Sequence, residues 1–68
     1  MNKQKCNESL ARMAAVAPQP VSGCVRTLAG IVEGHITPVS TRLTTAIQSL
    51  RRAGVPVEEF VAAYGDKD

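Results

Sequence analysis

The stretch TPVSTRLTTAIQSLRRAG, residues 37–54, decides the fold. An apolar residue recurs in it every three or four positions, which is the spacing of one helical face. These residues are Val39, Leu43, Ala46, Ile47, Leu50 and Ala53. Thr37 is a good N-cap, Pro38 is a good first helical residue, and Gly54 is a good terminator. We therefore predict a helix over 39–53 that buries its apolar side.

The same spacing continues on the N-terminal side of this stretch and predicts two more helices. Asn7 is an expected N-cap for the first helix, which Pro18 and Pro20 close. Residues 17–20 then form a short, stiff connector. The second helix has about three turns and ends at Gly34, in the usual C-cap position. Its apolar stripe consists of Val21, Cys24, Val25, Leu28, Ile31 and Val32.

A last short helix is predicted over 57–64, although residues 54–57 are also compatible with a short extended stretch. The predicted fold class is therefore all-α, with three to four short helices. No linker or repeat divides the chain, so residues 1–68 form a single small helical domain. Residues 1–6 and 65–68 are expected to fray.

Composition limits the core and excludes a membrane protein. The chain has 68 residues, 44% of them hydrophobic, and its aromatics are Phe60 and Tyr64 alone. A core made mainly of Ala, Val, Leu and Ile is thin, and a second copy or a partner often completes such cores. No apolar run approaches the ~20 residues of a membrane span, and no signal peptide is recognisable. We expect a cytoplasmic protein.

Residues that carry chemistry are few. Cys6 and Cys24 are too few for a disulfide framework, and a reduced compartment is the default. Together with His35 they match no structural zinc spacing. We expect Cys24 to be buried and His35 to lie in a solvated loop. The sequence therefore predicts no metal, no cofactor and no enzymatic activity.

Positive charge is concentrated in the middle of the chain. The net charge is +2, but residues 9–57 hold five arginines against the single acid Glu33. The polar side of the 39–53 helix contains no acid, which is compatible both with contact with nucleic acid and with the solvated side of an ordinary amphipathic helix. Arginines suit phosphate, and Ser, Thr and Gln suit base edges. The predicted DNA-binding residues are Ser40, Thr41, Arg42, Thr44, Thr45, Gln48, Arg51 and Arg52.

Residues 10–26, LARMAAVAPQPVSGCVR, resemble the helix-turn-helix of Cro and lambda-repressor-like regulators. In this resemblance Ala11 takes the tight helix–helix contact and Ala15 replaces the usual turn glycine. The Val-Ser pair at 21–22 matches the recognition helix. The resemblance implies a second set of DNA-facing residues, which are Gln19, Ser22 and Arg26.

Residues 28–57 are similar to small winged helix-turn-helix domains of phage and mobile-element proteins. The similarity rests on Ile-Thr-Pro at 36–38, Arg-Leu at 42–43 and Leu-Arg-Arg-Ala-Gly at 50–54. In such domains the helix ending in Leu-Arg-x-x-Gly enters the major groove. We prefer the 39–52 helix as the recognition helix, since its face is more polar and more basic.

These patterns predict a sequence-specific transcriptional regulator of phage or mobile-element type, which reads paired half-sites on double-stranded DNA as a homodimer. The alternative is a small protein-interaction module that binds and inhibits or modulates a host protein. A structural subunit of a larger assembly is a weaker third hypothesis. The predicted dimer or partner surface consists of Val57, Phe60, Val61 and Tyr64.

Overall fold

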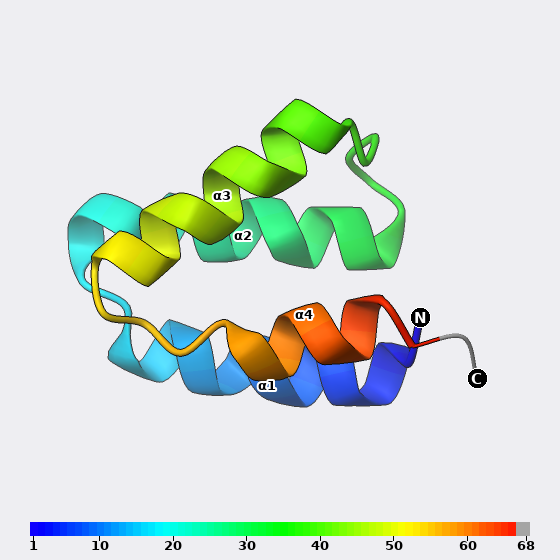
Figure 1. The fold of residues 1–68 in the computed structure, drawn as a ribbon, viewed down its shortest axis with the longest axis horizontal. Coiled ribbons are helices and arrows are strands. Elements are labelled where there is room, and N and C mark those ends of the chain that lie inside the picture. Colours follow the sequence, from blue (N-terminus) through cyan, green and yellow to red (C-terminus); the bar gives the residue numbers. More distant parts are fainter. Residues whose placement is uncertain (67–68) are drawn as a thin grey trace.

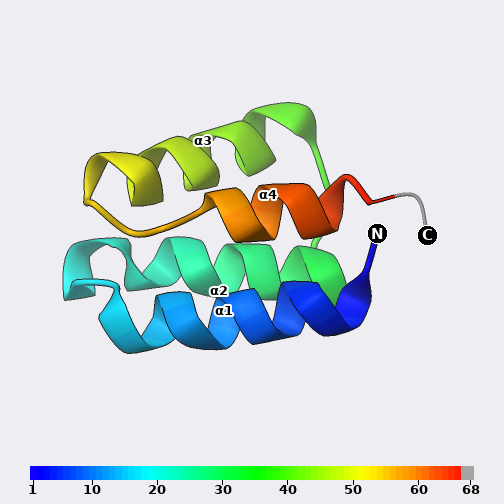
Figure 2. The same ribbon diagram turned by 60° about the horizontal axis from the view of Figure 1, so that its bottom comes forward.

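Four α-helices make up residues 1–66, the part of the chain that this computed structural model describes. They are α1 (Lys3–Val16), α2 (Gln19–Glu33), α3 (Ser40–Arg52) and α4 (Glu58–Tyr64). Figures 1 and 2 show α4 and α2 beside α1, and α3 beside α2, each pair antiparallel. No strand occurs in residues 1–66, so the all-α prediction is confirmed. The predicted fraying at positions 67–68 lies outside the described residues.

The core lies between the helices, and every helix contributes to it. As the composition predicted, most of its side chains are small and aliphatic; Phe60 is the largest fully buried one. The ring of Phe60 stacks on that of Tyr64 with 5.8 Å between centroids. The buried apolar residues are Cys6, Leu10, Met13, Val25, Leu28, Ile31, Val32, Ala46, Leu50, Val55, Val57, Phe60 and Ala63. The predicted stripe of the second helix is confirmed, with Val21 and Cys24 half-buried at its edge.

Helix α1 begins earlier than the sequence pattern predicted. Its N-cap is Asn2, whose side-chain oxygen accepts a hydrogen bond from the backbone N–H of Lys5 at 3.1 Å. The N–H of Asn2 in turn donates to the carbonyl oxygen of Ala63 at 2.9 Å, which ties the N-terminus to α4. Asn7 lies exposed inside the helix, so its predicted capping role is wrong. Cys6 is fully buried, so most of the segment expected to fray belongs to the fold.

The connection between α1 and α2 is shorter than predicted and consists of Ala17 and Pro18. Helix α2 already starts at Gln19, with Pro20 in its first turn. Proline is tolerated there because the N–H that it lacks has no partner within the helix. At the other end Gly34 adopts a left-handed conformation with φ of +84°, as the prediction of a glycine C-cap requires.

The N-cap of α3 is Val39 and its first helical residue is Ser40, whereas Thr37 and Pro38 were predicted for these two positions. Val39 is still extended, with φ of −70° and ψ of 134°, so it is the N-cap and the helix starts one residue after it. The N–H of Val39 donates to the carbonyl oxygen of Thr37 at 2.8 Å and forms a tight turn. Val39 and Ala53, both predicted to be buried, are exposed.

The connection from α3 to α4 passes through the core. Gly54 has φ of +84°, and the side chains of Val55 and Val57 are buried on either side of Pro56. Helix α4 starts at Glu58, one residue later than predicted, and Gly65 follows it. Within residues 1–66, no helix combines the length and the hydropathy that crossing a bilayer requires.

Candidate nucleic-acid interface

The outward side of α3 carries all eight residues of the first predicted DNA-binding set. We call this surface the α3 face, and each of its members is exposed to solvent. It consists of Ser40, Thr41, Arg42, Thr44, Thr45, Gln48, Arg51 and Arg52. Helix α3 itself contains no acidic residue, and the carboxylate of Glu58 from α4 lies beside Arg51 at its C-terminal end.

The opposite side of α3 fixes the helix to the rest of the chain. Ala46 and Leu50 are buried in the core, and Leu43 and Ile47 are half-buried beside them. Among the other helices, only α2 comes close to α3 (Figure 1). The anchoring residues recur at helical spacing, so they hold one side of α3 inward and leave the α3 face outward, where Arg51 meets Glu58 of α4.

The three arginines of the α3 face differ in their surroundings. An Nη atom of Arg42 donates to the carbonyl oxygen of Thr37 at 3.1 Å, which holds this side chain near the start of α3. Nε of Arg51 lies 3.8 Å from Oε1 of Glu58, in an exposed ion pair. The side chain of Arg52 has no ion pair or hydrogen bond to any residue within 1–66. Sequence reasoning missed Glu58, because seven positions separate it from Arg51 and the pairing depends on the turn at 53–57.

The uncharged side chains of the α3 face also differ from similar ones elsewhere in the chain. On α2, the hydroxyls of Ser22 and Thr27 donate to backbone carbonyl oxygens of their own helix, at 2.9 and 3.0 Å. The hydroxyls and amide of the α3 face make no such bond within residues 1–66. They are Ser40, Thr41, Thr44, Thr45 and Gln48. Their hydrogen-bonding capacity is thus open to solvent or to a bound molecule.

The second predicted set of DNA-contacting residues lies on α2. Gln19 and Arg26 are exposed, while Ser22 is half-buried and its hydroxyl is engaged by the carbonyl oxygen of Gln19. The arrangement that the Cro-like resemblance implies is not found in α1. Ala11 is exposed rather than packed between helices, and Ala15 lies inside α1 rather than in the turn.

The predicted dimer or partner surface is divided by the fold. Val57 and Phe60 are fully buried in the core of the chain, so neither side chain is accessible to a partner. This is a correction to the predicted surface. Val61 is 41% exposed and Tyr64 is half-buried, and these two residues are what remains of it.

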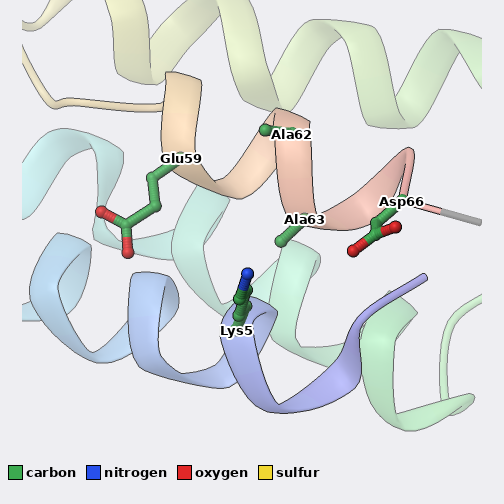
Figure 3. Close-up of a pocket in the computed structure, with 5 residues that line it drawn as sticks. All are labelled: Lys5, Glu59, Ala62, Ala63 and Asp66. Carbon is green, nitrogen blue, oxygen red and sulfur yellow. The ribbon is translucent and has the colours of Figure 1, made fainter. Parts of the chain in front are cut away.

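A shallow hollow of about 240 Å³ lies between α1 and α4, away from the α3 face (Figure 3). Lys5 rises into it between Glu59 and Asp66, and Ala62 and Ala63 line its floor. The carboxylate of Glu59 also pairs with Arg12. The hollow combines short apolar side chains with charges of both signs and contains no cysteine or histidine.

The residues that were considered as metal ligands are spread over the fold. Cys6 is buried in α1, Cys24 is half-buried in α2, and His35 is exposed after Gly34. Burial raises the pKa of the Cys6 thiol, and the positive N-terminus lowers it to a smaller extent. Within residues 1–66, no three Cys, His, Asp or Glu side chains are grouped so that they could hold a metal ion.

Comparison with known proteins adds no relative. No family model matches the chain, and neither a curated protein nor a solved structure is significantly similar to it.

Proposed function

We propose that this chain is a small, cytoplasmic transcription regulator of phage or mobile-element type that binds double-stranded DNA. Helix α3 enters the major groove, and a homodimer reads paired half-sites. One observation carries the proposal: the α3 face is exposed along its length, carries Arg42, Arg51 and Arg52, and contains no acid. The proposal includes no catalytic step and no cofactor.

The dimensions of α3 support a major-groove contact. Its 13 residues give a rod about 20 Å long. The major groove of B-DNA is about 12 Å wide and admits one helix. Arg42 lies near one end of this rod and Arg51 and Arg52 at the other, so guanidinium groups are present at both ends for phosphates beside the groove. The uncharged residues between them are of the types that read base edges.

The aromatic side chains argue against single-stranded nucleic acid as the partner. Proteins that bind single strands stack bases on exposed aromatic rings. The two aromatic residues of this chain are Phe60, which is fully buried, and Tyr64, which stacks on it. The major groove of A-form RNA is too narrow for side chains to read. Duplex DNA is therefore the polyanion that best suits this surface.

Salt dependence of DNA binding tests the proposal directly. We expect wild-type protein to bind random-sequence duplex DNA with an affinity that falls steeply between about 50 and 200 mM salt, because bound cations are released. The Arg42→Gln/Arg52→Gln variant should lower the log–log salt slope by about 0.9 for each lost phosphate contact. Arg12→Gln is the control for the loss of one positive charge away from the α3 face, since Arg12 of α1 pairs with Glu59, and its effect is compared with that of each single arginine variant. Absence of binding by the wild type at the lowest salt would refute the proposal.

Sequence specificity and dimerisation need separate tests. Selection from a random duplex pool should enrich a two-fold symmetric sequence, because symmetric dimers read symmetric sites. Sedimentation should give a species of twice 7.2 kDa. If the protein stays at 7.2 kDa when the selected duplex is added, the proposed homodimer is refuted.

The second candidate function is a protein-interaction module that binds a host protein. One observation favours it: Val61 is 41% exposed on α4, a helix that begins with two acidic residues, which repel phosphate. A Val61→Lys substitution should abolish capture of such a partner and leave DNA binding intact. The burial of Val57 and Phe60 leaves this surface small, so we rank the DNA proposal first.

A further inference from the structure

We propose that Glu58 is a built-in competitor of phosphate, which occupies Arg51 and thereby limits the affinity of the α3 face for DNA. This inference rests on the proposed function and concerns the regulation of the same surface. The ion pair joins Nε of Arg51, in the last turn of α3, to Oε1 of Glu58, the first residue of α4, at 3.8 Å.

The carboxylate of Glu58 is held near Arg51 by a second contact. Its other oxygen, Oε2, accepts a hydrogen bond from the backbone N–H of Val57 at 3.2 Å. The side chain therefore uses one oxygen on the backbone and presents the other to the guanidinium. Its position in the first turn of α4 also suits a negative charge, because the N-terminal end of a helix is positive. These contacts favour the conformation in which Glu58 competes for Arg51.

Other ion pairs of the described chain lie away from α3. Glu59 pairs with Arg12 of α1, and Glu33 pairs with Lys3, also of α1. Within residues 1–66, Glu58 is the acid whose carboxylate lies within ion-pair distance of an α3 arginine. The two arginines at the C-terminal end of the α3 face therefore differ. Arg51 forms an ion pair with a carboxylate, and its neighbour Arg52 forms none with any residue within 1–66.

This inequality has a measurable consequence. A phosphate that approaches Arg51 meets the charge of Glu58 and must displace it. Exposed pairs of this kind are weak, so removing the charge should raise DNA affinity by roughly two- to fivefold at low salt. The Glu58→Gln substitution suits this test, because the amide oxygen of glutamine can still accept the bond from the N–H of Val57.

The experiment measures binding of random-sequence duplex DNA by fluorescence anisotropy for wild type, Glu58→Gln, Glu59→Gln, Arg51→Gln and Glu58→Gln/Arg51→Gln. Glu59→Gln changes the net charge equally but releases Arg12 rather than Arg51. We expect a gain in affinity with Glu58→Gln that exceeds the gain with Glu59→Gln. The excess should disappear in the Arg51→Gln background, which a general charge effect would not do.

The outcomes separate this inference from the proposed function. If wild type binds DNA and both glutamate variants gain equally, the role of Glu58 is refuted while the DNA proposal stands. If wild type does not bind, the DNA proposal fails first. A comparison of Arg51→Gln with Arg52→Gln gives a second test that leaves Glu58 unchanged. The loss of Arg52 should reduce affinity and salt slope more than the loss of Arg51, and equal or reversed effects overturn the inference.

Discussion

In the turn between α2 and α3, the side chain of Ile36 packs on Gly30, and a methyl group added at Gly30 should break this contact. The carbonyl oxygen of Gly30 accepts hydrogen bonds from the N–H groups of His35 at 2.8 Å and Ile36 at 3.2 Å. These bonds lay the side chain of Ile36 over Gly30. A Cβ atom built on Gly30 would lie 2.4 Å from Cδ1 and 2.7 Å from Cγ1 of Ile36, where carbon atoms need about 3.5 to 4 Å. The Gly30→Ala variant therefore displaces Ile36.

The net effect of Gly30→Ala is the sum of two opposing contributions. Alanine in a helix interior is favoured over glycine by about 1 kcal/mol. Ile36 is half-buried, and full burial of an isoleucine stabilises a fold by about 1.5–3 kcal/mol, so its displacement costs about 1–1.5 kcal/mol. We expect Gly30→Ala to be neutral or destabilising by up to about 0.5 kcal/mol. Gly23→Ala on the same helix should stabilise by about 1 kcal/mol, because nothing lies within 4 Å of its added Cβ.

Urea unfolding followed by circular dichroism measures both variants and a third, Gly30→Ala in an Ile36→Ala background. That background removes the two closest atoms, Cδ1 and Cγ1, and leaves the Cβ of residue 36 at 3.5 Å from the added methyl, which is an ordinary contact. There Gly30→Ala should recover the gain of about 1 kcal/mol seen at Gly23. If Gly30→Ala alone stabilises as much as Gly23→Ala, Ile36 does not occupy this position in solution and the reasoning is refuted.

Three further predictions concern the N-terminal half. Asn2→Ala should destabilise by about 1 kcal/mol in thermal unfolding because it removes the cap on the N–H of Lys5, whereas Asn7→Ala should not destabilise. An alkylating reagent should modify the half-buried Cys24 in the native protein and reach Cys6 only after unfolding, and equal rates by peptide mass spectrometry would contradict the burial of Cys6. Burial raises the pKa of Cys6, so the folded chain retains the thiol proton to higher pH than the unfolded chain does. Stability should therefore decline as pH rises above about 8.5, and less steeply in Cys6→Ala.

Helix periodicity was enough to predict an all-helical chain of three to four helices but not where each helix begins. Residues 3–9 contain Cys6 as their one strongly apolar member, so the pattern gave no reason to start a helix before Asn7. The start depends on a contact distant in sequence, the hydrogen bond from the N–H of Asn2 to Ala63. Glycine terminators were easier to predict, because the left-handed conformation of Gly34 is a local property.

The polar and apolar sides of helices were not equally predictable. A polar residue on an amphipathic helix has one stable location, at the surface, and all eight predicted residues of the α3 face lie there. An apolar side chain can be buried either in the core of its own chain or against a partner protein. The sequence therefore could not show that Phe60 packs internally while Val61, its neighbour, stays 41% exposed.

The residues that anchor α3 in the core are separate from those of the α3 face. Replacing an exposed side chain that packs against nothing changes stability by about 0.5 kcal/mol or less. Ala46 and Leu50 can stay constant while the outward positions vary. The chain is in this respect a natural starting point for combinatorial libraries in which the α3 face is varied and the architecture is retained.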